Sequence, residues 1–279
     1  MKSKRFIMES FIYLFIMIMV VFTLYPIIYT VLGSFKSNSE LTLGSGFFPE
    51  QWRIENYKQA FIQADFTKYT INSILVSVCA MILATVTTSL AGFTFARRDF
   101  VGKKLLLSMY VSLMFVALGS VTLYPIYTLL SSMNLHKSPA GLVLALVGGQ
   151  ASNVMLVMGF VKGIPKELDE AAIIDGCSVY GVFFKIILPL IKPILAVVAL
   201  FSFRSAWNDY ITTLIMSISQ PNLKTLTVAV VQLKYSANAA AEWNIMLAGA
   251  SIAIIPILIV YFLCNKQFIG GLTAGAVKG

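Results

Sequence analysis

KGIPKELDEAAIIDGCSVYGVFFKIILPLIKP, residues 162–193, is a polar segment inside a mostly apolar chain. Four of the chain's acidic residues lie close together in it: Glu167, Asp169, Glu170 and Asp175. Apolar segments flank it on both sides. A charged segment in this position predicts a surface that lies outside the hydrocarbon of a membrane and meets something there.

The same segment predicts two short helices. Pro165 suits a first helical position, where its missing N–H costs nothing, and acids in the following turns suit the helix dipole. Gly176 is placed to end this helix in a left-handed conformation. Ser178 can cap a second, apolar helix. We expect Pro189 to break that helix and Pro193 to open the next one.

The spacing of the residues inside the segment carries a resemblance. The pattern is Glu170-Ala171-Ala172, three residues, Gly176, nine residues, and then Ile186-x-Leu188-Pro189. It resembles the EAA loop of permease subunits of binding-protein-dependent ABC importers and fills that pattern without a gap. The resemblance implies a coupling helix that sits in a cleft of a cytoplasmic ATPase subunit. The residues that it assigns to coupling are Glu170, Ala171, Ala172, Asp175, Gly176 and Pro189.

We further expect Glu170 to be the main ionic contact to the ATPase, with the small residues Ala171, Ala172 and Gly176 allowing close approach. The simpler alternative is an ordinary cytoplasmic loop that contains two helices.

The composition indicates a polytopic membrane protein. Of 279 residues, 58% are hydrophobic and 12% are charged, whereas a soluble domain carries about 25% charged residues. Backbone groups in hydrocarbon need partners inside the protein, so apolar runs of about 20 residues must be helices. The predicted fold class is therefore all-α. The net charge of +9 does not indicate a nucleic-acid partner, because the positive residues flank apolar spans and form no basic stripe.

We predict one transmembrane permease domain over residues 1–279. Its six transmembrane helices are expected at about 11–33, 69–96, 105–135, 138–161, 194–219 and 245–264. The coupling loop, residues 162–193, then lies between helices four and five. A Gly-rich tail follows at residues 265–279, and its composition is compatible with an extended conformation.

The distribution of Lys and Arg predicts the orientation. Six spans place both termini and the coupling loop on one side, which carries thirteen of the 21 basic residues. The other side carries seven, and Arg204 lies inside a span. The positive-inside bias therefore predicts cytoplasmic termini and a cytoplasmic loop. The resemblance implies that this membrane is the bacterial inner membrane.

The fifth predicted span is not fully apolar. It contains Arg204, Trp207, Asn208 and Asp209. A charge at the bilayer centre costs about 2.5–3.5 kcal/mol, so such residues usually face the bundle interior. Arg204 and Asn208 are four apart and share a helix face, whereas Arg204 and Asp209 do so only if the helix is broken.

An aromatic ring beside hydrogen-bonding groups suits a sugar. We therefore regard Trp207, Asn208, Asp209 and Arg204 as candidate residues of a translocation path. The alternative is helix packing with a tryptophan at the membrane interface.

Five further stretches resemble the second permease of maltose-type transporters, so the resemblance covers nearly the whole chain. They are Tyr25-Pro26, Glu55-Asn56-Tyr57, Asn72-Ser73, Ala206-Trp207-Asn208-Asp209 and residues 268–279, FIGGLTAGAVKG. The resemblance implies half of the pathway of an ATP-driven sugar or oligosaccharide importer. Its partners would be a homologous permease, two cytoplasmic ATPase subunits and an extracytoplasmic solute-binding protein.

This chain is not expected to be an enzyme or to bind a cofactor. It has no Gly-rich phosphate loop with its lysine, so ATP and Mg would bind to the ATPase subunits. The one histidine, His136, has no cysteine or carboxylate nearby in the sequence, which argues against a metal site.

Three other functions compete with this one. An ion-coupled secondary transporter would fit six helices but would not need the EAA spacing. An intramembrane enzyme would need a nucleophile with a base, or paired carboxylates, at depth. An importer permease for amino acids, phosphate or metals would share the EAA loop.

Overall fold

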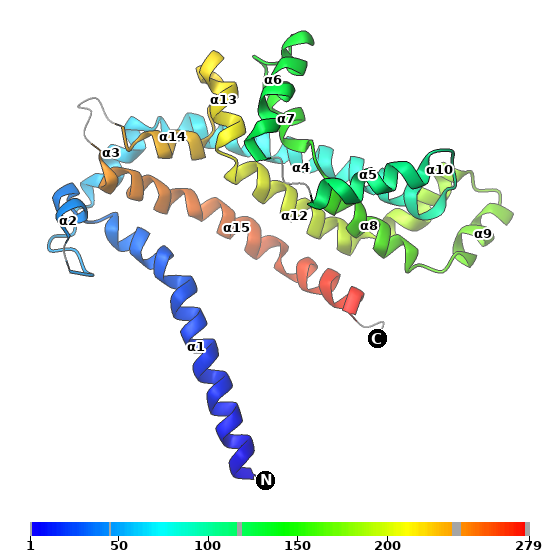
Figure 1. Cartoon of the computed structure of the whole chain (residues 1–279), viewed down its shortest axis with the longest axis horizontal. Coiled ribbons are helices and arrows are strands. Elements are labelled where there is room, and N and C mark those ends of the chain that lie inside the picture. Colours follow the sequence, from blue (N-terminus) through cyan, green and yellow to red (C-terminus); the bar gives the residue numbers. More distant parts are fainter. Residues whose placement is uncertain (1, 45, 116–118, 236–240, 277–279) are drawn as a thin grey trace. The chain divides into compact units, whose positions relative to one another are not determined.

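The computed structural model describes residues 2–44, 46–115, 119–235 and 241–276, with side chains for those within 8–262. The described backbone consists of α-helices, short 3₁₀ and π turns and loops, as the all-α prediction requires (Figure 1). The chain divides into two compact units. The first is Met1–Tyr69 with Val228–Ile255, and the second is Thr70–Thr227 with Pro256–Gly279.

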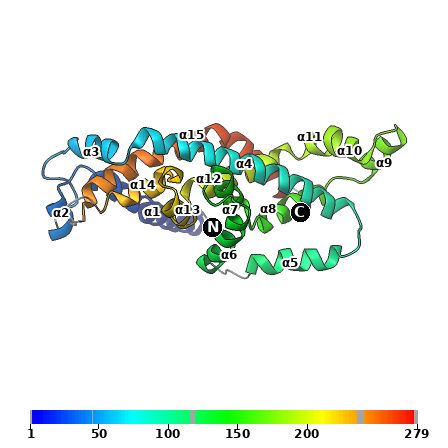
Figure 2. The same ribbon diagram turned by 90° about the horizontal axis from the view of Figure 1, so that it is seen from above.

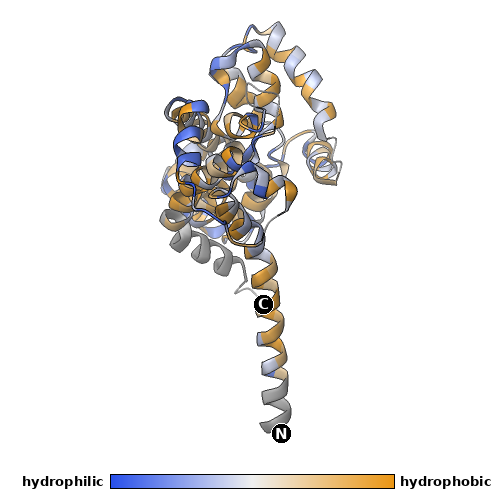
Figure 3. Cartoon of the chain, turned by 90° about the vertical axis from the view of Figure 1, so that its left-hand side faces the viewer, coloured by the Kyte–Doolittle hydropathy of each residue, from blue (hydrophilic) through white to orange (hydrophobic). Residues whose placement is uncertain are grey.

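The first unit is built from helices near both ends of the chain. They are α1 (Lys2–Gly33), α2 (Asn38–Leu43), α3 (Glu55–Gln63), the start of α4 (Phe66–Arg97), most of α14 (Leu226–Gln232) and the first part of α15 (Trp243–Ala276). Helix α1 is apolar along almost all of its described length, as Figure 3 shows. A helix that is apolar on every side suits a lipid environment.

A buried asparagine joins the loops of the first unit. Asn56, which is 5% exposed, donates from Nδ2 to the carbonyl oxygens of Ser34 (2.7 Å) and Lys36 (2.9 Å). Its Oδ1 accepts a hydrogen bond from Nδ2 of Asn244 (3.0 Å). One side chain therefore satisfies backbone groups after α1 and also connects them to the start of α15.

The cap of α2 predicts a pH effect. Ser37 accepts from the Glu40 N–H, and Glu40 accepts in return from the Ser37 N–H (2.6 Å) and the Glu50 N–H (2.9 Å). The bond from Glu50, followed by those from Ser37, lowers the pKa of Glu40 from 4.5 to about 2. Because the folded pKa lies below the unfolded one, this stabilisation is complete above about pH 4.5 and is lost as the pH falls toward 2.

We predict that Glu40→Gln speeds amide exchange in residues 37–50 about fivefold at pH 6, equivalent to about 1 kcal/mol. The difference from wild type should shrink toward pH 2. Hydrogen–deuterium exchange, corrected for intrinsic rates, measures it. Glu55→Gln is the control. Glu55 is exposed, and its ion pair with the exposed Lys58 is long, at 3.9 Å, so losing it should change little. Equal protection of wild type and Glu40→Gln at pH 6 would contradict the prediction.

The second unit holds the remaining elements. They are the rest of α4, α5 (Lys103–Phe115), η1 (Gly119–Thr122), α6 (Leu123–Ser132), α7 (Pro139–Val147), α8 (Ala151–Lys162), α9 (Glu167–Ile174), α10 (Val179–Gly181), η2 (Val182–Ile187), α11 (Leu188–Leu190), α12 (Lys192–Asn208), α13 (Ile211–Ser219), η3 (Pro221–Leu223) and the rest of α15. Figures 1 and 2 place α9 at one end of this unit, well away from α13.

Two large apolar clusters form most of the core of the second unit. One joins the C-terminal half of α4 to α8, α9, η2 and α12, and its largest fully buried members are Ile187, Ile191, Val157, Val161, Val182, Val197 and Val198. The other joins the earlier part of α4 to α6, α7, α12, α13 and η3. Helix α4 is thus common to both clusters.

Three of the described helices are long and apolar enough to cross a membrane: Met8–Gly33, Phe66–Arg97 and Trp243–Phe262. They coincide with the predicted first, second and sixth spans. Two bent pairs pass the same test, Pro139–Val147 with Ala151–Lys162 (60°) and Val179–Leu190 with Lys192–Asn208 (78°). Counting each pair as one span gives up to five, so six spans remain a prediction.

The predicted third, fourth and fifth spans are each divided in the structure. The third consists of α5, η1 and α6, and residues 116–118 lie outside the described part. The fourth bends at Gly148 and Gly149, where Gly149 has φ +75°, a conformation that glycine adopts without strain. The fifth ends its first helix at Asn208 and resumes at Ile211.

The backbone of the predicted tail also differs from an extended conformation. Helix α15 continues to Ala276, so residues 265–276 are helical. No proline follows Pro256 to stop the helix, and once a helix is formed each further residue adds a hydrogen bond at little cost. Residues 277–279 lie outside the described part of the chain.

Candidate functional site

Helix α9 carries the EAA residues, and its C-terminal end lies where the sequence predicts. It begins at Glu167, later than the Pro165 start that the sequence predicts, because the carbonyl of Lys166 is the first to accept helical bonds. Its last turn leads into Asp175, and Gly176 follows with φ +83°. The left-handed glycine that the sequence predicts is therefore confirmed.

The second helix of the loop is capped as predicted but ends later than predicted. The Ser178 hydroxyl accepts a hydrogen bond from the Gly181 N–H (3.2 Å). Pro189 lies inside α11, and the helix ends only at Ile191. A π-helical turn precedes Pro189 and changes the hydrogen-bond pattern, so that the missing N–H does not stop the helix there. Pro193 occupies the first turn of α12, as predicted.

The predicted coupling residues divide into exposed and buried ones. Ala172 is 5% exposed and belongs to the core around α8 and η2, so its small size allows close packing inside this chain. In this chain the small size of Ala172 therefore serves packing against α8 and η2, and its part in the approach of an ATPase remains a prediction. The exposed members are Glu170, Ala171, Asp175, Gly176 and Pro189.

Exposed apolar side chains lie on α9 and α10, the helices at and after Glu170. Ile174 is 85% exposed and Tyr180 is 76% exposed, and Leu168 and Ile173 are also exposed. We call Leu168, Glu170, Ile173, Ile174 and Tyr180 the coupling surface. A surface with exposed apolar side chains and an exposed acid can bind a groove that contains a positive charge.

One ion pair that sequence reasoning missed holds α9 against the end of α4. Arg97 Nε lies 2.8 Å from Asp169 Oδ2, and the two side chains are 5% and 15% exposed. The same guanidinium donates from Nη2 to the carbonyl of Ile164 (2.8 Å). The only sequence signal was an arginine at a helix end and an acid in the loop, and neither indicates its partner.

The residues around the end of α12 do not form one surface. Trp207 is 2% exposed and stacks on Phe203, with ring centroids 5.7 Å apart, so its ring offers no face to a solute here. Asp209 caps α13 and accepts from the Thr213 N–H (2.8 Å) and the Thr212 hydroxyl (2.8 Å).

By contrast, Arg204 and Asn208 are exposed on one face of α12. The structure therefore places these two predicted residues side by side and exposed, whereas Trp207 is buried and Asp209 is used in a helix cap.

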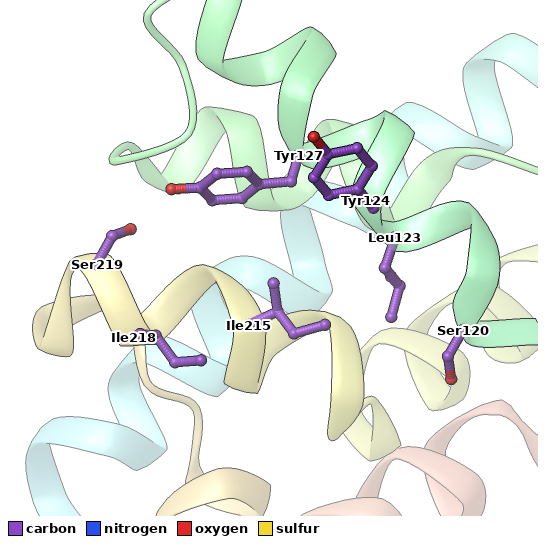
Figure 4. Close-up of a pocket in the computed structure, with 7 residues that line it drawn as sticks. All are labelled: Ser120, Leu123, Tyr124, Tyr127, Ile215, Ile218 and Ser219. Atoms are coloured by element: carbon purple, nitrogen blue, oxygen red, sulfur yellow. The ribbon is translucent and has the colours of Figure 1, made fainter.

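A cavity of about 350 Å³ lies between α6 and α13 (Figure 4). Its lining residues are Ser120, Leu123, Tyr124, Tyr127, Ile215, Ile218 and Ser219. Figure 4 shows the Tyr127 hydroxyl directed toward the end of α13 that carries Ser219. Two aromatic rings with a few hydroxyl groups suit a sugar. Sequence reasoning missed this cavity, although two tyrosines three residues apart on one helix were a usable signal.

Residues 85–268 match the family described as "Binding-protein-dependent transport system inner membrane component". The chain belongs to this family. The match includes the whole coupling loop and the end of α12. The protein is accordingly an inner-membrane permease component of a transport system and not an enzyme.

Two relatives of this permease are aligned over their whole length. The galactooligosaccharides transport system permease protein GanQ of Bacillus subtilis is 31% identical over 100% of this chain and 99% of its own. The maltodextrin transport system permease protein MdxG of the same organism is 28% identical, with the same coverage.

A similar fold occurs in the crystal structure of a bacterial ABC transporter involved in the import of the polysaccharide alginate. The TM-score is 0.78, with 21% identity over 96% of this permease and 98% of that chain.

Proposed function

We propose that this permease forms half of the pathway of an ATP-driven importer for a sugar or oligosaccharide. The observation that carries the proposal is a complete EAA motif on an exposed helix that ends at Gly176 with φ +83°. The relatives named for galactooligosaccharides and maltodextrin support a carbohydrate as the solute.

The partners follow from the chemistry of the coupling surface. A cytoplasmic ATPase subunit would receive α9 in a groove, with Glu170 meeting a positive residue and Ile173 and Ile174 covering the groove's apolar walls. A second permease would complete the pathway, and an extracytoplasmic solute-binding protein would deliver the sugar. In this arrangement we place six spans with both termini in the cytoplasm, which the distribution of basic residues supports.

The exposed face of α12 is our candidate for sugar contact within the pathway. Arg204 and Asn208 present one guanidinium and one amide on the same side of the helix. Trp207 would act by holding this helix in place through its buried ring, and Asp209 by capping α13. Both would then support the pathway without touching the sugar.

The first experiment is purification of a tagged chain from its native membranes in mild detergent. Recovery of an ATPase subunit and a second permease supports the proposal. The recovered complex is then reconstituted into proteoliposomes with its solute-binding protein. Uptake of radiolabelled maltotriose, galactobiose, arabinobiose and cellobiose is measured with and without ATP. Uptake that persists without ATP and stops with an ionophore would identify a secondary transporter instead.

We predict that Asn208→Ala lowers the uptake rate at limiting sugar about fivefold, the effect of one lost neutral hydrogen bond. Ser108→Ala is the control, because Ser108 is an exposed polar residue on a different helix, α5. Uptake kinetics in the proteoliposomes measure both variants. Equal uptake by Asn208→Ala and wild type would remove Asn208 from the pathway.

A further inference from the structure

We propose that α4 transmits movement of the coupling helix to the wall of the cavity between α6 and α13, with Arg97 and Asn72 as the positioning residues at its two ends. The inference rests on the proposed function, because it assumes that an ATPase moves α9. It adds a route inside this chain along which that movement travels.

The cytoplasmic end of the route is the Arg97 guanidinium. It holds α9 at two points, the Asp169 carboxylate and the Ile164 carbonyl. Because Ala172 is the one buried side chain of α9, these contacts and the packing of Ala172 fix the helix relative to α4. A buried ion pair that loses one partner is strongly destabilised, so α9 and the end of α4 are expected to move together.

The other end of the route is formed by two polar side chains of α4. Asn72 donates from Nδ2 to the carbonyls of Asn222 (2.7 Å) and Lys224 (3.1 Å). Ser73, which is 1% exposed, accepts from the Leu226 N–H (2.7 Å). These bonds hold the segment that directly follows α13. Helix α13 in turn supplies one wall of the cavity in Figure 4.

Between these ends α4 is suited to act as a rigid element. It has no proline between Asn72 and Arg97, and 25 residues of α-helix span about 38 Å. Both large apolar clusters of the second unit include residues of α4. A displacement of α9 would therefore be delivered at residues 222–226 rather than absorbed on the way.

The test measures sugar transported per ATP hydrolysed by the reconstituted wild-type complex and its variants. The sugar is whichever of the four radiolabelled probes the wild type imports. Asp169→Ala and Asn72→Ala are each expected to lower this ratio at least tenfold while the complex still assembles and still hydrolyses ATP. Asp169→Glu, which keeps the carboxylate, should stay within threefold of wild type.

Two controls separate positioning from simple loss of folding. Glu167→Ala removes an exposed acid from another face of α9, and Thr87→Ala removes a hydroxyl from the middle of α4. Both should leave the ratio unchanged. A purely structural role of Asp169 would instead lower uptake and ATP hydrolysis together, in proportion to the complex recovered.

The outcomes that overturn the proposal are distinct from failure of the proposed function. An unchanged ratio in either Asp169→Ala or Asn72→Ala overturns it. If Asp169→Ala does not assemble, Asp169→Asn takes its place, and failure of both to assemble also overturns it. Absence of ATP-dependent uptake in the wild type would reject the proposed function itself.

Discussion

Gly92→Ala is expected to lower the free energy of unfolding of the second unit by about 1–3 kcal/mol, the usual cost of overpacking. Gly92 lies where α4 packs on α8. A Cβ atom there would lie 2.6 Å from Val157 Cγ1, 2.8 Å from Val157 Cβ and 3.0 Å from the Met158 backbone nitrogen. The Val157 Cβ and the Met158 backbone nitrogen cannot avoid the clash by a change of rotamer, so α4 and α8 would have to move apart.

Gly159→Ala is the matched control, because Gly159 lies in α8 and a Cβ there would meet nothing within 4 Å. Alanine should be neutral or stabilising at that position by up to about 1 kcal/mol. Thermal unfolding in detergent, followed by tryptophan fluorescence, measures both variants. The same melting temperature for the two would show that α4 and α8 have room to adjust.

Glu170→Lys is expected to lower co-purification of the ATPase subunit at least tenfold, equivalent to about 1.4 kcal/mol or more. The change removes an acid from the centre of the coupling surface and adds repulsion toward a positive residue of the partner. Because Glu170 is exposed, the permease itself should still fold and reach the membrane.

Glu55→Lys is the control for the change in net charge. Glu55 is exposed on α3 and lies on the opposite side of the membrane in the predicted topology. Quantitative pull-down and ATP-driven uptake are measured for both variants. Normal uptake by Glu170→Lys would rule out Glu170 as the main ionic contact.

Local signals in the sequence predicted local features correctly. The left-handed glycine at Gly176 and the serine cap at Ser178 depend on residues within a few positions, so their chemistry can be recognised without a structure. The long apolar runs of α1 and α4 were equally clear. Hydrophobicity determined these helices because hydrocarbon leaves the backbone few alternatives.

The features that were missed depend on residues far apart or on breaks inside apolar runs. Four helices, α5 to α8, separate Arg97 from Asp169 in the sequence, and nothing local pairs them. Trp207 has a suitable side chain for sugar contact, but packing against Phe203 buries it. The adjacent glycines Gly148 and Gly149 are a signal for an interrupted helix, but the apolar residues around them favoured one continuous span.

The break after Asn208 has a mechanical consequence. Helix α12 closes its own hydrogen bonds before it, and α13 begins after it with a cap supplied by Asp209. The joint between them is therefore a ready-made hinge. Bending a continuous helix would open hydrogen bonds in a medium with no water to replace them. Rotation at Asp209 and Tyr210 would preserve the hydrogen bonds within each helix, so a change in the angle of α13 would have to overcome only its side-chain packing, including that of Met216.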